Sequence, residues 1–210
     1  VGTVLSSHFL KKGYWVTVLD NFIYHNQFAI LPYVSDSDYR FVYGDINDEK
    51  ALSKAAQGVT DVVLLAGLVG DPITKKYPNE SEIINEEGIK KCIDFFNGKS
   101  IDKFVFISTC SNYGLIKENE LADENFPLNP LSLYAKAKVA NEKYLITKKG
   151  IYDYTGVVLR FATAFGLSPR MRFDLSISEF VRDIFFGQEL LVYDEHTWRA
   201  YCHVRDFARL

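Results

Sequence analysis

Short apolar runs alternate along this chain with stretches in which apolar residues recur at helical spacing. The runs are rich in β-branched and aromatic residues, and their near-continuous apolarity indicates strands that are covered on both faces. Glycines follow the helical stretches, where a C-cap glycine is expected. We therefore expect strands at Tyr14–Asp20, Tyr39–Ile46, Asp61–Gly67, Lys103–Thr109 and Gly156–Gly166, and helices at Val1–Lys12, Asp48–Ala56, Asn85–Phe96 and Ser132–Lys148.

Strands that alternate with helices predict an α/β fold with a doubly wound parallel sheet and right-handed crossovers. After Gly166 the pattern changes to a loop, a helix at Leu175–Phe186 and a short strand, LLVYD, at Leu190–Asp194. The sequence thus predicts one domain over residues 1–166, and part of a smaller lobe mixed with a return to the core over residues 167–210. The chain starts inside a helical pattern and stops where HVRDFARL begins a helix, so we expect a fragment without its first strand.

Composition and charge limit which partners and metal sites are expected. The 210 residues are 48% hydrophobic, enough for a sizeable core, and the net charge of −3 comes without a long basic run. Nucleic acid and anionic membranes are therefore disfavoured as partners. The three scattered cysteines argue against a disulfide framework and a zinc site, and they fit a cytoplasmic protein. No apolar run is long enough to span a bilayer, and the four histidines form no metal-ligand spacing.

The spacing Tyr-x-x-x-Lys occurs in three pairs: Tyr113/Lys117, Tyr134/Lys138 and Tyr144/Lys148. Tyr113 precedes Gly114 in a loop, so its lysine need not share its face. Tyr144 lies ten residues beyond Tyr134, which is roughly 15 Å further along a helix. Only Tyr134 and Lys138 lie in the early turns of a helix, one turn apart on the same face. This pair is our candidate for proton transfer, and an ordinary surface pair is the alternative.

Ligands of a doubly wound sheet bind at the carboxyl ends of its strands. Asp20 ends such a strand, where a carboxylate accepts hydrogen bonds from ribose hydroxyls and repels a 2′-phosphate, so it favours NAD over NADP. A solvated Asp at a strand end is an equally good reading. Gly2 fits the last glycine of a phosphate-binding fingerprint, and Asp45 with Ile46 either flanks the adenine or forms a turn. The small residues of LLAGLVG (64–70) suit a backbone lying against a dinucleotide, or an ordinary strand exit.

Taken together, these segments resemble the NAD-dependent sugar-nucleotide epimerase/dehydratase family of extended short-chain dehydrogenases/reductases. The matching residues cover nearly the whole chain in order: Gly2, Asp20, Asp45-Ile46, Leu65-Ala66-Gly67, Asn85 with Gly88, STCSNYG (108–114), YAKAK (134–138) with Glu142, LRFATAFG (159–166) and WRAYCHVRD (198–206). The chain departs from the family in lacking the start of the glycine motif and most of the C-terminal lobe. In addition, Thr163 stands where many members have Asn.

The resemblance implies a Rossmann-type fold, an NAD cofactor and a nucleotide-sugar substrate. Tyr134 would remove or return the proton of a sugar hydroxyl, Lys138 would lower the pKa of that phenol and hold the nicotinamide ribose, and Thr109 would orient the sugar oxygen. Hydride would pass between NAD and one sugar carbon, typically C4. The implied cofactor contacts are Gly2, Asp20, Asn21, Asp45, Ile46, Leu65, Ala66, Gly67, Asn85, Tyr134, Lys138 and Phe161.

For the substrate, the expected contacts are Ser111, Asn112, Thr163, Arg172 and Arg199. The two arginines match a diphosphate because guanidinium binds phosphate bidentately, and exposed loop arginines are the alternative. The resemblance also implies a homodimer, because the family commonly pairs two such helices with those of a second copy across a two-fold axis. The helices here would be Asn85–Phe96 and Ser132–Lys148, which carry apolar residues on more than one face: Ile89, Ile93, Phe96, Val139 and Leu145.

The resemblance leaves four reactions open: epimerisation, net oxidation or reduction, 4,6-dehydration, and NAD binding without turnover. Dehydratases of the family have carboxylates directly after the residue that matches Thr109, whereas this chain has Cys110 and Ser111. Strand alternation would point Cys110 away from the face of Thr109, and an unactivated hydroxyl is a weak acid and base. We therefore expect redox chemistry at one carbon without loss of water, unless Glu118 or a residue of the absent lobe supplies the acid.

Overall fold

The computed structural model describes residues 1–117, 119–193 and 195–210, and it leaves the side chains of Asp71 and Pro72 undescribed. Contacts group the chain into two compact units. The first unit comprises residues 1–18, 22–40 and 161–210, and the second comprises residues 19–21 and 41–160. The functional division at Gly166 stays a prediction, because these units follow spatial contacts rather than function.

A parallel sheet organises the second unit, in the order β3 (Asp61–Leu64), β4 (Lys103–Thr109) and β5 (Thr155–Phe161). Asp61 lies opposite Lys103 and Leu64 opposite Phe106, so β4 continues past the end of β3 by Ile107, Ser108 and Thr109. This overhang places Thr109 at the carboxyl edge of the sheet, where ligands of such folds bind. Strands β1 (Val16–Asp20) and β2 (Tyr39–Tyr43) form a separate pair.

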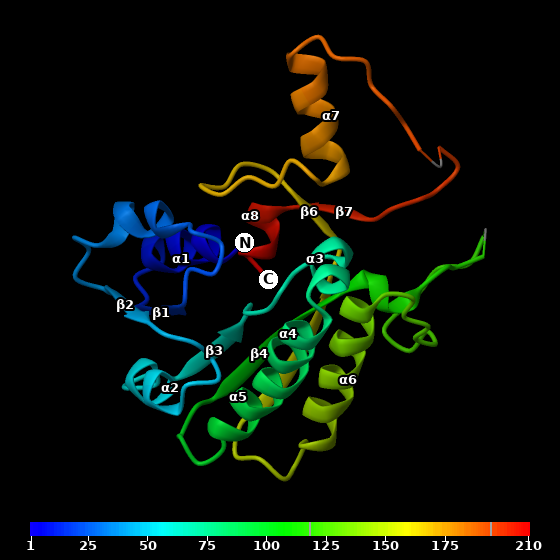
Figure 1. The fold of residues 1–210 in the computed structure, drawn as a ribbon. Helices are drawn as coiled ribbons and strands as arrows, with labels where there is room; N and C mark the ends of the chain where they lie inside the picture. The colour runs from blue at the N-terminus through cyan, green and yellow to red at the C-terminus, as the bar shows by residue number, and fades with distance from the viewer. Residues whose placement is uncertain (118, 194) are drawn as a thin grey trace. The chain divides into compact units, whose positions relative to one another are not determined.

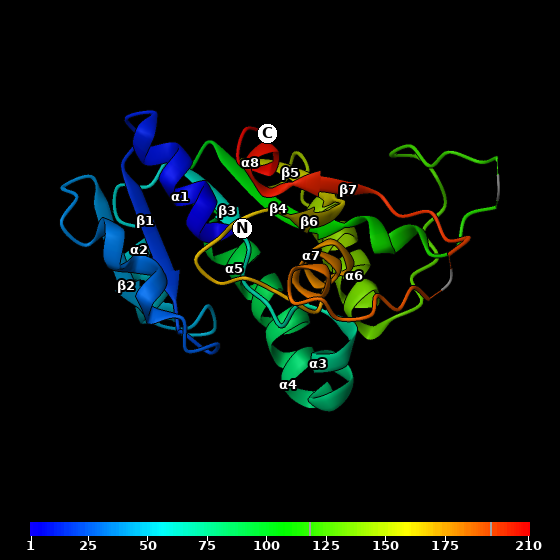
Figure 2. The same cartoon turned by 90° about the horizontal axis from the view of Figure 1, so that it is seen from above.

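Helices of the second unit pack beside one another and against β4 (Figure 1). The chain runs from α3 (Asp71–Lys76) and α4 (Pro78–Glu82) through a π-helical turn, η2 (Ile83–Gly88), into α5 (Ile89–Phe95). The long helix α6 (Leu133–Thr147) contacts α5, η2 and β4, and α5 and α6 lie side by side in Figure 1; Figure 2 gives the view from above, with α3 and α4 in front of α5. A short helix α2 (Glu49–Ala55) follows β2, and a 3-10 turn, η3 (Cys110–Tyr113), follows β4.

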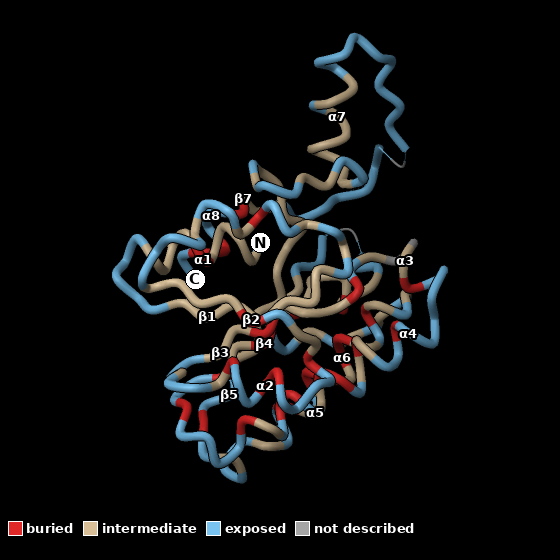
Figure 3. The backbone as a smooth tube through the Cα atoms, turned by 60° about the vertical axis from the view of Figure 1, so that its left-hand side comes forward, coloured by how far each residue is buried: buried red, intermediate tan, exposed pale blue. Residues whose placement is uncertain are grey.

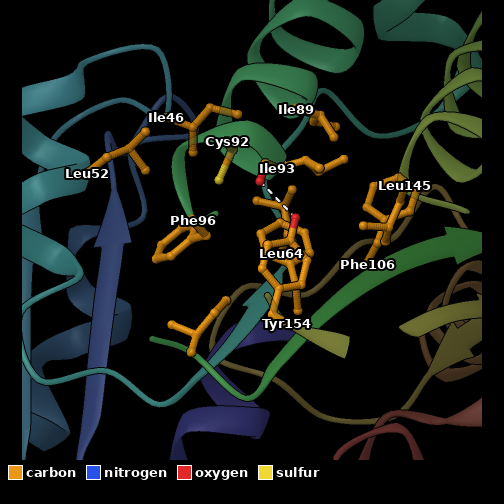
Figure 4. Close-up of a cluster of buried hydrophobic side chains, with 12 residues drawn as sticks. Ile46, Leu52, Leu64, Ile89, Cys92, Ile93, Phe96, Phe106, Leu145 and Tyr154 are labelled. Atoms are coloured by element: carbon orange, nitrogen blue, oxygen red, sulfur yellow. Dashed lines mark hydrogen bonds between the residues drawn. The ribbon is translucent and has the colours of Figure 1, made fainter. Parts of the chain in front are cut away.

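The core of the second unit lies between these helices and the sheet (Figure 3). Phe104 and Phe106 are completely buried on one face of β4, and Tyr154 stacks on Phe104 with ring centroids 5.6 Å apart. The Tyr154 hydroxyl donates a hydrogen bond of 2.8 Å to the Ile93 carbonyl, so the polar end of this ring is satisfied (Figure 4). The buried cluster consists of Ile46, Leu52, Leu64, Ile89, Cys92, Ile93, Phe96, Ile101, Phe104, Phe106, Leu145 and Tyr154.

In the first unit, α1 (Gly2–Lys11) packs against α8 (Val204–Phe207). Strand β6 (Thr163–Phe165) pairs in parallel with β7 (Tyr201–His203), with Thr163 opposite Tyr201. The 3-10 helix η1 (Gln27–Tyr33) and α7 (Ser176–Phe185) complete this unit. None of the helices in the described ranges combines the length and apolar character that crossing a bilayer requires.

Most of the expected elements are confirmed to within a few residues, and the strand Lys103–Thr109 agrees at both ends. The four glycines expected at helix ends, Gly13, Gly58, Gly98 and Gly150, have φ of 79°, 73°, 77° and 73°. The strand expected at LLVYD is wrong over residues 190–193, which form no strand, and Asp194 lies outside the described residues. The expected strand Gly156–Gly166 is interrupted at Ala162, so it is divided into β5 and β6.

The basis of the expected homodimer also needs correction. Ile89, Ile93, Phe96, Val139 and Leu145 are all buried within the chain itself, because they pack toward the core rather than outward. They cannot form a contact with a second copy, so a dimer would use other residues of these helices. The homodimer itself stays a prediction.

Candidate active site

The start of α6 places the expected proton-transfer pair. Ser132 caps the helix, since its hydroxyl accepts a hydrogen bond of 3.1 Å from the Ala135 amide. Tyr134 therefore lies in the first turn and Lys138 one turn later. Half of the buried residues of α6 are polar or charged: Lys138, Asn141 and Glu142 are buried beside Ala135, Val139 and Leu145. Buried polar groups are unfavourable unless they are partnered, so each of them needs an explanation.

Lys138 is only 5% exposed. Its ammonium donates a hydrogen bond of 2.7 Å to the Ile107 carbonyl on the overhang of β4, and it lies 4.6 Å from the Phe106 ring centroid and 5.8 Å from that of Tyr134. Burial lowers the pKa of Lys138 to about 8, and the Glu142 carboxylate opposes that shift. The site thus holds a desolvated cation next to a tyrosine ring, which is the arrangement that proton transfer by a phenol needs.

The other two Tyr-x-x-x-Lys pairs have different surroundings. The Tyr113 hydroxyl accepts a hydrogen bond of 3.1 Å from Arg160. The Tyr144 hydroxyl donates to the carboxylate of Asp94 at 2.7 and 2.8 Å, and Lys148, which is half-buried, lies over the Tyr144 ring, 4.4 Å from its centroid. Among the three pairs, Tyr134 and Lys138 alone combine a common helix face with a buried lysine. The geometry therefore favours Tyr134 and Lys138 as the proton-transfer pair, as the sequence predicted.

Thr109 ends β4 and caps the turn η3. Its hydroxyl oxygen accepts a hydrogen bond of 3.2 Å from the Ser111 amide, and accepting this bond does not use the hydroxyl proton. Cys110 is the first residue of η3 rather than a continuation of the strand, so the alternation argument for its side chain does not apply. Ser111 is half-buried in the same turn.

The carboxyl ends of β1 and β2 bring together three of the expected cofactor residues. The Asn21 amide donates a hydrogen bond of 2.6 Å to the carboxylate of Asp45, and the Asp20 carbonyl accepts one of 3.3 Å from the Gly44 amide. The other Asp45 oxygen accepts from the backbone and side-chain amides of Asn47 at 2.8 and 2.9 Å. Two carboxylates thus lie near this edge, where ribose hydroxyls could be bound, whereas the next residue, Ile46, is packed into the core.

The exit of β3 is held by Asn85 from the π-helical turn. Its side chain accepts a hydrogen bond of 2.7 Å from the Leu68 amide and donates one of 2.9 Å to the Leu68 carbonyl. A Cβ on Gly67 would lie 2.8 Å from the Asn85 oxygen, so glycine is needed for this close approach. Asn85 is itself buried, and Asn141 of α6 donates a hydrogen bond of 2.6 Å to its carbonyl. The buried side chain of Asn85 therefore fixes the backbone that follows β3, at Gly67 and Leu68.

These strand ends fit a dinucleotide. They combine carboxylates near β1 and β2, small residues after β3, and a buried cation beside β4, all within the second unit. Five further expected residues belong to the first unit. There the Phe161 ring stacks on Phe207 at 3.9 Å between centroids, the Thr163 amide donates to the Ala200 carbonyl at 3.0 Å, and Arg172 forms a bidentate pair with Asp174. Gly2 begins α1, and Arg199 is exposed.

Asn112 is completely buried, which does not fit the expected contact with substrate. Its amide donates hydrogen bonds to Ser108 at 3.0 Å and to Glu142 at 2.7 Å, so it faces inward. Sequence reasoning gave no role to Glu142 or to Arg160, which bind each other at 2.8 Å. A signal was present, because Arg160 lies in an otherwise apolar strand and a buried charge requires a partner.

The sequence model described as the NAD dependent epimerase/dehydratase family matches residues 1–210. A dTDP-glucose 4,6-dehydratase from Streptomyces niveus is 29% identical over 203 residues, which is 95% of this chain and 59% of that protein. UDP-glucuronate 4-epimerase 6 from Arabidopsis thaliana is 28% identical over 220 residues, covering 100% of this chain and 47% of that protein.

Among solved structures, UDP-glucuronic acid 4-epimerase from Bacillus cereus, in complex with UDP-glucuronic acid and NAD, matches with a TM-score of 0.87. It is 25% identical, and the match covers 100% of this chain and 68% of that one. The likeness confirms the expected Rossmann-type α/β fold, and the family description confirms the expected type of cofactor. The chain spans roughly half the length of the two curated relatives. Since the family match extends from the first residue to the last, the chain belongs to the NAD-dependent epimerase/dehydratase family.

Proposed function

We propose that this chain carries the NAD-binding and proton-transfer parts of an enzyme that acts on a nucleotide-activated sugar, as an epimerase or a related oxidoreductase. The observation that carries the proposal is the burial of Lys138 beside Tyr134, with its ammonium on the Ile107 carbonyl. A buried lysine with a pKa of about 8 is unfavourable for folding, and such groups concentrate at functional sites.

In this mechanism Tyr134 removes the proton of a sugar hydroxyl and later returns it, and Thr109 donates a hydrogen bond that orients the same oxygen. Lys138 favours loss of the Tyr134 proton because a neighbouring positive charge stabilises a phenolate. NAD, when bound, supplies the acceptor for a hydride from the sugar carbon, which we assign to C4. Asp20 and Asp45 would hold ribose hydroxyls, and Leu65–Gly67 would lie against the dinucleotide.

The relatives include both 4-epimerases and a 4,6-dehydratase, so the fate of the sugar must be argued from the site. Elimination of water needs an acid for the leaving hydroxyl and a base for the neighbouring carbon. The residues after Thr109 are Cys110 and Ser111, which offer no carboxylate, and Glu118 lies outside the described residues. We propose that the sugar keeps its oxygen, and mass spectrometry of the product would show no loss of water. A product lighter by one water would contradict this proposal.

The test of the function is turnover of UDP-, GDP-, CDP- and dTDP-sugars by the full-length protein with NAD. Tyr134→Phe should lower kcat by at least about a thousandfold, a typical size for loss of acid/base catalysis, while NAD still binds. Tyr144→Phe is the matched control, because it removes the hydroxyl of a tyrosine with the same spacing to lysine but bound to Asp94. Bound NAD that is never reduced, together with no conversion of any sugar nucleotide, would favour a non-catalytic NAD-binding protein.

A further inference from the structure

A buried group of polar side chains lies behind the proposed site. It consists of Ser108, Asn112, Tyr113, Glu142 and Arg160, and we call it the Glu142 cluster. Glu142 is 1% exposed, Asn112 is 0% exposed, and the Arg160 side chain is 17% exposed. None of the three takes the sugar proton in the mechanism proposed above, and the effect of Glu142 on the pKa of Lys138 does not account for the burial of Asn112 and Arg160.

Both carboxylate oxygens of Glu142 are used within the cluster. One accepts hydrogen bonds from the Asn112 amide at 2.7 Å and from Nε of Arg160 at 3.2 Å. The other accepts from Nε and Nη2 of Arg160 at 3.0 and 2.8 Å. The Asn112 amide also donates to the Ser108 hydroxyl at 3.0 Å. A fully partnered buried ion pair adds little net stability compared with apolar residues, but it fixes its members in one arrangement.

The cluster joins the elements that carry the proposed site. Glu142 lies on α6 one turn after Lys138, Asn112 and Tyr113 belong to the turn that follows Thr109, and Arg160 belongs to β5. Arg160 extends the connection, because Nη1 donates at 3.1 Å both to the Tyr113 hydroxyl and to the Glu124 carbonyl. The segment from Thr109 to Tyr113 is therefore held against α6 by side chains that do not reach the site themselves.

We infer that Glu142 is a positioning residue, which holds the Thr109–Tyr113 segment against α6 through Asn112 and Arg160, so that Thr109 and Tyr134 act on the same sugar oxygen. The inference rests on the proposed function for its catalytic part only, since the attachment of the segment can be measured without turnover. Small errors in the placement of reacting groups reduce the rate strongly, whereas they change binding much less.

The sharpest test exchanges the amide and the carboxylate of the cluster. Glu142→Gln removes the charge that pairs with Arg160 and replaces one acceptor oxygen with an N–H group, which must then face the guanidinium or the Asn112 amide. Asn112→Asp places a second carboxylate against Glu142. In the double variant Glu142→Gln/Asn112→Asp, the glutamine amide can donate to the new aspartate while its oxygen accepts from Arg160. The double variant therefore keeps one carboxylate, one guanidinium and one amide in the cluster.

Each single variant should lower kcat by about 10- to 100-fold, with KM for the sugar nucleotide and Kd for NAD changed less than about threefold, as expected for misplaced reacting groups. The double variant should recover at least about tenfold of the kcat lost by the worse single variant, which is the signature of two coupled residues. Asp61→Asn is the control, because it converts an exposed carboxylate of the same unit to an amide and should leave kcat unchanged. A double variant no better than the worse single one would overturn the inference.

Hydrogen exchange of the backbone amides of residues 109–113 gives the second readout. Exchange in this segment should be faster in Glu142→Gln and return toward the wild-type rate in the double variant, with no change in Asp61→Asn. If the wild type turns over no sugar nucleotide, the proposed function is wrong. Hydrogen exchange of residues 109–113 still tests whether Glu142 holds this segment against α6. Unchanged exchange in Glu142→Gln would overturn the inference even in an active enzyme. If a single variant does not fold, recovery of folding and activity in the double variant supports coupling, and failure of the double variant contradicts it.

Discussion

At the scale of single residues, the most informative group is a lysine that burial makes unfavourable. The ammonium of Lys138 has exchanged water for the Ile107 carbonyl and the Phe106 ring. A pKa lowered from 10.5 to about 8 corresponds to a penalty of about 3 kcal/mol for the charged form in the folded chain. Residues of active sites commonly lower the stability of the fold in this way. The effect of Lys138 on the free energy of unfolding therefore tests its assignment to the proposed site.

Lys138→Met should raise the free energy of unfolding by about 1–3 kcal/mol at neutral pH, because it replaces a desolvated charge with an apolar chain of similar length. Below pH 8 the lysine is charged in both the folded and the unfolded chain, and above 10.5 it is neutral in both, so the wild type is stabilised as pH rises from about 8 to 10.5. The advantage of the variant should shrink over that window in urea titrations. A constant difference would mean that the lysine is not desolvated.

Asp20 provides the second test at this scale. Asp20→Asn removes the negative charge that would repel a 2′-phosphate and keeps the size of the side chain. The ratio of Kd for NADP to Kd for NAD should fall by at least about tenfold, or about 1.4 kcal/mol, measured by titration of the full chain. Asp123→Asn, a change at an exposed position, should leave the ratio unaltered. Equal Kd values for the two cofactors in the wild type would remove Asp20 from this role.

At the scale of elements, apolar periodicity predicted the strands and helices that build the core, because burial of Phe104, Phe106, Ile89 and Ile93 depends on that spacing. It failed where local geometry decides. The segment LLVYD has a strand-like composition, but residues 190–193 form no strand in the described part of the chain. Whether such a segment pairs depends on tertiary contacts that its own composition does not encode. The helix expected at Asn85 begins earlier, through a π-helical turn that no periodicity of 3.6 residues reveals.

For the proposed site, motif spacing gave three Tyr-x-x-x-Lys pairs, and position in the early turns of one helix favoured Tyr134 and Lys138. The connection between Asn112, Glu142 and Arg160 joins three separate elements, so it depends on tertiary packing that spacing within the sequence does not encode. The same limit explains why Asn112 was expected to face the substrate. Its neighbour Ser111 is half-buried in the same turn, and the direction of each side chain follows from the 3-10 geometry of η3.

The turn after β4 supplies a test of this element. Gly114 has φ of 70°, and a Cβ there would lie 2.2 Å from the Asn129 carbonyl oxygen. Gly114→Ala should therefore lower the free energy of unfolding by more than about 2 kcal/mol, through strain and collision together. Gly58→Ala is the matched control, because Gly58 has φ of 73° with no atom within 4 Å of its Cβ position, and about 1 kcal/mol is expected there. Equal losses in urea titrations would show that the collision is relieved by a small shift.

At the scale of the whole molecule, we predict a homodimer that uses outward residues of α5 and α6. Ile146 of α6 is 57% exposed and could form part of such a contact. Ile146→Glu should convert the dimer to a monomer in light scattering at micromolar concentration, because a carboxylate would lose its hydration in the interface. Ile151→Glu, just beyond α6 and also exposed, should leave the mass unchanged. A wild-type chain that is monomeric under these conditions would contradict the prediction.

The environment of Lys138 also determines how the binding of cofactor would appear in a calorimeter. A group that titrates at about 8 carries its proton only part of the time in ordinary assay buffers, and a charged ligand beside it shifts that fraction. Binding then takes up or releases a fraction of a proton, and the buffer contributes its own heat of ionisation to the signal. Enthalpies measured in Tris and in phosphate would differ for this reason alone, so the heat of binding has to be extrapolated to a buffer of zero ionisation enthalpy.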